Sequence, residues 1–137
     1  MAVQLTPSHG RWSFPAGTAG LQQYQFCALN STGQLIMPAA TGVFAVVLDD
    51  APSLQVSTVG TGGVVTGGYT VGTNYGTVFD GIMKVISGAN LTPGAAIQTD
   101  TNGHAVPAVS GGVILGYTLA ASSSGDVISV LLDRSKA

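Results

Sequence analysis

Charged residues are scarce in this sequence of 137 residues. Asp, Glu, Lys and Arg make up 7% of it, against about 25% in ordinary soluble domains. Glutamate is absent and the formal net charge is −2. The four basic residues are Arg11, Lys84, Arg134 and Lys136. Because they form no basic cluster that could neutralise phosphates, we do not expect nucleic acid as a direct partner.

Long apolar runs and cysteines are also few. The longest uninterrupted apolar run covers residues 43–48, far below the roughly 20 residues of a membrane-spanning helix. The first twelve residues, MAVQLTPSHGRW, lack the apolar centre of a signal peptide. We therefore expect neither a membrane association nor export by the usual route. The single cysteine, Cys27, excludes an intrachain disulfide and is expected to be a small core residue.

Residue types that carry catalysis or bind metals are too scattered to form a site. His9 and His104 lie in or beside turns, and no Gly-x-Ser-x-Gly motif is present. Asp49 and Asp50 are adjacent, so they do not resemble two carboxylates facing each other across a glycosidic bond. One cysteine and two distant histidines do not have the spacing of a zinc site. We therefore expect no enzyme activity, catalytic residue, metal or cofactor.

Glycine and β-branched residues, in contrast, are abundant. The 20 glycines and the Val- and Ile-rich apolar runs are typical of short strands joined by tight turns. Residues 23–29 alternate with a period of two, and the run 43–48 fits a strand that is buried on both faces. No segment has a sustained helical period with caps. The sequence therefore predicts an all-β fold.

Residues 21–46 and 91–116 share one pattern of turns and apolar runs. A shift of seventy positions places the turn NSTG at 30–33 over the turn DTNG at 100–103. Asn102-Gly103 is the strongest turn signal in the chain. The same shift pairs Leu21 with Leu91, Gly33 with Gly103, Gly42 with Gly112 and Val43 with Val113. We therefore expect a small glycine-rich β-barrel or sandwich-like domain built from two similar β units.

The chain is expected to have an extended N-terminal arm at 1–19 and a single β domain at 20–137. Prolines and glycines break up the arm, which also carries Trp12 and Phe14. These two aromatic side chains pack either on their own domain or on a neighbouring subunit. A glycine-rich insertion at about 60–80 forms either a long loop or an exposed hairpin that turns at Gly67-Gly68.

Seven short motifs follow one another in an order that resembles a known family. They are NSTG at 30–33, GVFAVVL at 42–48, KV at 84–85, TPG at 92–94, DTNG at 100–103, GVILGYT at 112–118 and GDVISVLL at 125–132. This succession, over about 12–59 and 81–132, resembles the small capsid decoration, or cement, proteins of tailed bacteriophages. The family passes almost directly from its V-x-V strand to its K-V strand, whereas this chain inserts about 61–80.

The resemblance implies a structural protein on the outside of a phage head, made in the host cytoplasm. Such proteins bind the major capsid protein, often as trimers, and brace the lattice without enzymatic activity. Few charges and a Ser/Thr/Gly-rich β surface fit wide interfaces, and repetition by symmetry strengthens attachment. Trp12, Phe14 and Arg11 are the expected contacts with the capsid or a neighbouring subunit.

A second hypothesis is a host- or glycan-binding β module that is displayed on a virion. The inserted segment would then make the contact, through Tyr69 and Tyr75.

Overall fold

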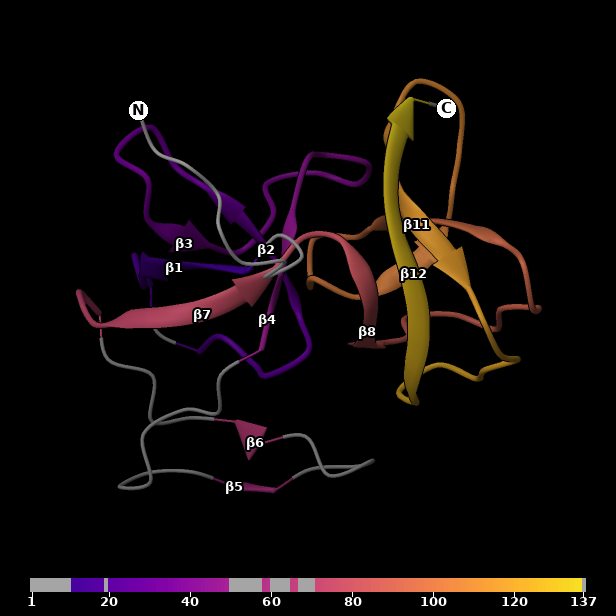
Figure 1. Cartoon of the computed structure of the whole chain (residues 1–137), viewed down its shortest axis with the longest axis horizontal. Coiled ribbons are helices and arrows are strands. Elements are labelled where there is room, and N and C mark those ends of the chain that lie inside the picture. The colour runs from indigo at the N-terminus through magenta and orange to yellow at the C-terminus, as the bar shows by residue number, and fades with distance from the viewer. Residues whose placement is uncertain (1–10, 19, 50–57, 60–64, 67–70, 137) are drawn as a thin grey trace.

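Two five-stranded antiparallel sheets dominate the described part of this computed structural model, which comprises residues 11–18, 20–49, 58–59, 65–66 and 71–136 (Figure 1). Sheet 1 has the order β1 (Arg11–Pro15), β7 (Asn74–Val78), β4 (Val46–Leu48), β2 (Phe26–Leu29), β3 (Leu35–Ile36). Sheet 2 has the order β8 (Gly81–Ile86), β12 (Val127–Lys136), β11 (Val113–Thr118), β9 (Ala96–Thr99), β10 (Ala105–Pro107). The all-β prediction is confirmed.

The two sheets repeat one topology. When the five strands of each sheet are counted in chain order, the first strand pairs with the fifth, and the fourth strand lies in the middle of the sheet. The strands β9 and β10 begin seventy positions after β2 and β3, as the sequence repeat predicts. We call sheet 1 with its turns, residues 11–49 and 71–79, unit 1, and residues 81–136 unit 2. The prediction of two similar β units is confirmed.

The two predicted turns of the repeat have the same geometry. Oδ1 of Asn30 accepts the backbone N–H of Thr32 and of Gln34, at 3.0 and 2.9 Å. Oδ1 of Asp100 accepts the corresponding N–H groups of Asn102 and His104, both at 2.9 Å. The glycines that follow, Gly33 and Gly103, have φ angles of 79° and 77°. Only a residue without a Cβ adopts this conformation without strain, so the two turns need glycine at these positions.

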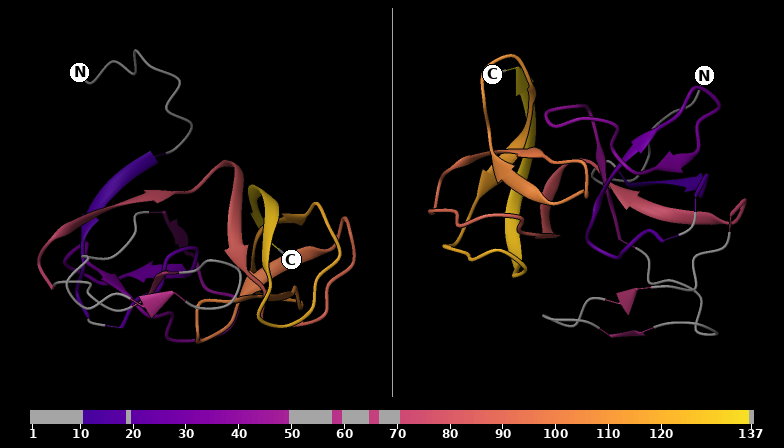
Figure 2. Two further views of the ribbon diagram at one scale, coloured as in Figure 1. Left: turned by 90° about the horizontal axis from the view of Figure 1, so that it is seen from below. Right: turned by 180° about the vertical axis from the view of Figure 1, so that it is seen from behind.

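Each sheet curls so that its two outermost strands approach each other (Figure 2). An isolated parallel bridge joins Ala16 to Leu35 in unit 1, and another joins Ser87 to Ala105 in unit 2. The backbone N–H groups of Gly17 and Gly88 donate to the carbonyls of Leu35 and Ala105, at 2.7 and 2.8 Å. These links between the edge strands partly close each sheet into a small barrel.

Two clusters of buried side chains form the core. The inner face of sheet 1 encloses a cluster of its own: Ala16, Leu21, Cys27, Leu35, Val46, Leu48 and Tyr75. The second cluster combines residues of both units: Phe26, Ala45, Val47, Val78, Val85, Leu91, Ile97, Ala105, Leu115, Ile128, Val130 and Leu132. The outer face of sheet 1 therefore helps to cover the interior of unit 2, and burial of apolar surface holds the two units together.

The boundary of the expected N-terminal arm needs correction. Arg11–Pro15 forms β1, which pairs with β7 over its whole length. The next residue, Ala16, is fully buried in the core of unit 1. Cross-strand hydrogen bonding and this burial make residues 11–18 part of the β domain. Residues 1–10 lie outside the described residues.

The region expected as an insertion is organised differently from the prediction. Thr58 pairs with Thr66 and Val59 with Val65, so β5 (Thr58–Val59) and β6 (Val65–Thr66) form a separate two-stranded sheet. The strand before Gly67-Gly68 thus pairs with an upstream strand, and the predicted turn at Gly67-Gly68 lies outside the described residues. The segment 74–78 is not an insertion, because it is β7 of sheet 1. Between the equivalent strands, unit 1 has residues 49–73 where unit 2 has 119–126.

Candidate interaction surfaces

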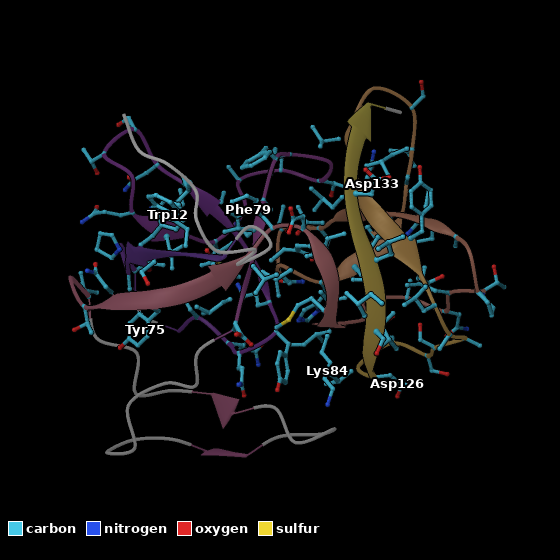
Figure 3. All side chains as sticks on the ribbon, viewed as in Figure 1. Trp12, Tyr75, Phe79, Lys84, Asp126 and Asp133 are labelled. Atoms are coloured by element: carbon cyan, nitrogen blue, oxygen red, sulfur yellow. The ribbon has the colours of Figure 1, made fainter. Side chains whose placement is uncertain are left out.

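Trp12 is the most prominent apolar side chain on β1. Its indole is 64% exposed, and its backbone carbonyl accepts a hydrogen bond from Oγ1 of Thr77 at 2.8 Å. Figure 3 shows it on sheet 1, in the unit that also carries Tyr75 and Phe79. A tryptophan that is held on a hydrogen-bonded strand and is largely accessible has the properties of an interface anchor.

The other candidate aromatic residues are placed differently. Phe14 is partly buried and packs against the core of unit 1, opposite Tyr75 in the β1–β7 register. Tyr75 is 7% exposed and belongs to that core. The expectation of an exposed loop contact at Tyr75 is therefore wrong, because alternation along β7 turns this side chain inward. Tyr69 lies outside the described residues, and the side chain of Arg11 is also outside them.

The seam between the two units is a dense set of backbone contacts. The N–H of Phe26 donates to the carbonyl of Gly103 at 2.7 Å, and the N–H of Ile86 donates to the carbonyl of Tyr24 at 3.0 Å. Gly42 donates to Thr99 and accepts from Val113, at 2.9 and 2.8 Å. A Cβ on Gly103 would collide with the side chain of Gln25 and the carbonyl of Phe26. The seam therefore requires glycine at position 103 for close approach as well as for its φ angle.

Tyr24 has an unusual backbone conformation at this seam. Its φ angle is 65°, in the left-handed region, and it is the non-glycine residue for which the structure gives a positive value. Its N–H donates to Leu48 at 2.7 Å, and the N–H of Gly94 donates to Thr118 at 2.8 Å in the same way. Gly94, with a φ of 81°, is its counterpart in the repeat. Sequence reasoning missed Tyr24, although the shift of seventy positions places a tyrosine over a glycine there.

A pocket of about 320 Å³ lies at the seam. Its lining comes from both units: Tyr24 and Asp49 from unit 1, and Ile82, Met83, Lys84 and Ser129 from unit 2. It combines an aromatic ring, a carboxylate, an amine and a hydroxyl with apolar side chains. Figure 3 shows Lys84 on the side of unit 2 that faces unit 1. The pocket thus brings side chains of different chemistry from the two units together.

A row of side chains crosses the outer face of each sheet at equivalent positions. Outer row 1 consists of Phe26, Val47 and Val78, which are directly opposite one another on β2, β4 and β7. Outer row 2 consists of Ala96, Tyr117, Leu131 and Ile82, on β9, β11, β12 and β8.

The two rows differ in their exposure. Phe26 and Val47 are fully buried and Val78 is 5% exposed, because unit 2 covers them. In outer row 2, Leu131 is 40% and Ile82 is 69% exposed. Ala96 and Tyr117 are partly buried. Outer row 2 is therefore a solvent-facing apolar stripe, and its counterpart in the same chain is an interface.

Reactive groups are sparse in the described part of the chain. Burial raises the pKa of the Cys27 thiol from 9.0 to about 12, so the thiol stays protonated at neutral pH. Among the described residues, no three His, Cys, Asp or Glu side chains gather as a metal site would require. The same part of the chain contains no helix with the length and apolarity needed to cross a bilayer.

The comparisons with known proteins identify a structural neighbour. No protein-family model matches the sequence. No curated protein sequence matches it. The structure is similar to the crystal structure of the N base of the head fiber gp8.5 of bacteriophage phi29, with a TM-score of 0.65 and 17% sequence identity. The similarity covers 93% of this chain and 98% of that one. At this identity, the likeness establishes a shared fold over almost the whole length of both chains.

Proposed function

We propose that this chain is a structural protein of a phage head, which attaches to the outside of the capsid and stabilises the lattice of the major capsid protein. The observation that carries the proposal is the shared fold with the phi29 head fiber base, which extends over 93% of the chain. The succession of motifs that resembles capsid decoration proteins supports the proposal independently.

The surface chemistry supports a role in assembly. Only 7% of the residues are charged, so little desolvation of charge opposes a wide protein interface. Exposed apolar side chains are present on both units, among them Trp12, Phe44, Ile82 and Leu131. A phage head repeats each binding position many times, and a trimer of this chain would attach through three equivalent contacts. We expect the chain to act as such a homo-oligomer.

Binding to heads tests this proposal directly. Purified protein is added to expanded heads from which it has been removed, and binding is measured by co-sedimentation. We expect saturable binding at a fixed ratio to the major capsid protein, and a higher temperature for release of the packaged DNA. Heads that bind no protein, or that bind it without a change in that temperature, would contradict the proposal or its stabilising part, respectively.

The alternative is a module displayed on the virion that binds a glycan of the host surface. The seam pocket favours it, because Tyr24 offers a ring for stacking while Asp49, Lys84 and Ser129 offer hydrogen-bonding groups. A glycan array probed with the wild-type protein and with Lys84→Ala tests this function. Selective binding that the substitution removes would support it, and an array with no signal for either protein would reject it.

A further inference from the structure

We infer that outer row 2 is a self-association surface, and that it binds unit 1 of a second copy of this chain in a head-to-tail contact. The contact between the two units of one chain supplies the template. In that contact, outer row 1 of unit 1 covers the interior of unit 2. The inference concerns self-association and does not depend on attachment to a capsid.

The exposed half of the contact lies on unit 2. Register equates Val78 with Leu131 and Val47 with Tyr117, because each pair occupies the same place in the repeated topology. Val78 is 5% exposed where Leu131 is 40% exposed, and Ile82 extends the stripe to β8. The stripe thus keeps apolar side chains at the positions that form the intrachain interface. The stripe is one row wide, since Lys84 and Ser129, which lie opposite each other two positions along on the same face, are polar.

The receiving half lies on unit 1, whose interior residues near β1 are more open than their counterparts. Trp12, opposite Thr77, corresponds to Met83, opposite Val130. Trp12 is 64% exposed, whereas Met83 packs against the core that unit 1 covers. Phe79 is only partly buried, and its counterpart Leu132 is 3% exposed. Trp12 and Phe79 therefore form an accessible aromatic rim on unit 1. The equivalent residues of unit 2 are covered by unit 1.

The polarity of the contact follows from the position of these two surfaces. Outer row 1 and the core of unit 1 lie on opposite faces of sheet 1, because Phe26 joins one cluster and the adjacent Cys27 joins the other. The rim of unit 1 and outer row 2 are therefore different surfaces, and joining them is heterologous. One hydrogen bond of the seam cannot form in the contact between two copies. At the seam the backbone N–H of Ile86 is the donor, and its counterpart in unit 1 is Pro15, which has no backbone N–H. Packing must then supply most of the contact between copies.

Two substitutions at exposed positions separate the halves of this contact. Leu131→Asp places a charge in outer row 2, and Trp12→Asp places one on the rim of unit 1. Val109→Asp is the matched control, because Val109 is 60% exposed and lies on the turn between β10 and β11. Circular dichroism and thermal unfolding establish that each variant is folded. The mass in solution is then measured by sedimentation equilibrium across the accessible concentration range.

We expect the wild type and Val109→Asp to form oligomers, and each of the other two variants alone to have the mass of one chain, 13.7 kDa. The decisive measurement mixes the two defective variants. Leu131→Asp retains an intact rim and Trp12→Asp retains an intact outer row 2, so the mixture should form a one-to-one heterodimer. A wild type that is monomeric at all concentrations, or a mixture that forms no heterodimer, would overturn the inference. Oligomers of Trp12→Asp alone would also overturn it, since they indicate a symmetric contact. Binding to heads is scored separately, so failure of the capsid proposal would leave this result unaffected.

Discussion

Unit 1 and unit 2 have the same topology and different surroundings. Their sheets share one strand order, and their Asn/Asp turns share the same hydrogen bonds. Yet outer row 1 is buried against unit 2, whereas outer row 2 faces solvent. The difference shows that the topology does not require this face to be buried. Side-chain choice along the outer row, with phenylalanine at 26 and alanine at 96, adapts each copy to its own neighbour.

The largest expected change in stability comes from removing the biggest side chain of outer row 1. Phe26→Ala leaves a cavity in a fully buried site, and we expect it to lower the free energy of unfolding by about 3–5 kcal/mol. Leu131→Ala, in outer row 2, should lower it by about 0.5 kcal/mol or less under conditions where the protein is monomeric. Urea unfolding measures both values. Equal losses for the two variants would mean that outer row 1 is not a packed interface.

The two turn glycines give a second matched pair. Gly33 has open space where a Cβ would project. Gly33→Ala should therefore lower the free energy of unfolding by about 1 kcal/mol, from the positive φ angle alone. Gly103 has a similar φ angle, but its Cβ would meet Gln25 and the carbonyl of Phe26. Gly103→Ala should therefore cost about 1–3 kcal/mol more, as overpacking does. Thermal unfolding measures the difference, which is a readout of the seam.

Local chemistry explains why much of this fold was predictable from the sequence. Asn102-Gly103 and its counterpart at 32–33 encode turns through the φ angle of glycine. Period-two alternation at 23–29 indicates a strand, which the structure forms at 26–29 with Phe26 and Cys27 buried on opposite faces. These signals depend on neighbouring residues only. The repeat, the all-β class and the burial of Cys27 could be predicted from these signals.

The candidate contact residues were less predictable, because their exposure depends on pairing between distant segments. Trp12 and Tyr75 are both aromatic residues near glycines, and nothing local distinguishes them. The pairing of β1 with β7 places Tyr75 inside the core and leaves Trp12 mostly exposed. The seam was equally hidden, since its backbone contacts join residues far apart in the chain, such as Phe26 and Gly103. The five-residue strand β1, which ends in Pro15, was also too short to be recognised from the sequence as part of a sheet.

Cys27 distinguishes the two units chemically, since its counterpart in unit 2 is Ile97. Burial raises the pKa of the thiol to about 12 from 9.0, so the unfolded chain releases this proton at lower pH than the folded chain. The contribution to stability is complete below pH 9 and is lost as the pH rises toward 12. The slope is about 1.4 kcal/mol per pH unit in that window. Urea unfolding of the wild type and of Cys27→Ala at a series of alkaline pH values isolates this effect. Parallel curves would contradict it.

The smallest expected effect concerns Tyr24 and Gly94, the equivalent residues with positive φ angles of 65° and 81°. Tyr24→Ala removes the ring and keeps a Cβ in the left-handed region, whereas Tyr24→Gly removes both the ring and the strain. The glycine variant should therefore be more stable than the alanine variant by about 1 kcal/mol, measured by thermal unfolding. Gly94→Ala should be destabilised by a similar amount, since no atom obstructs its Cβ and the φ angle is the main cost. If Tyr24→Ala is instead the more stable of the two, position 24 does not carry the backbone strain that its counterpart implies.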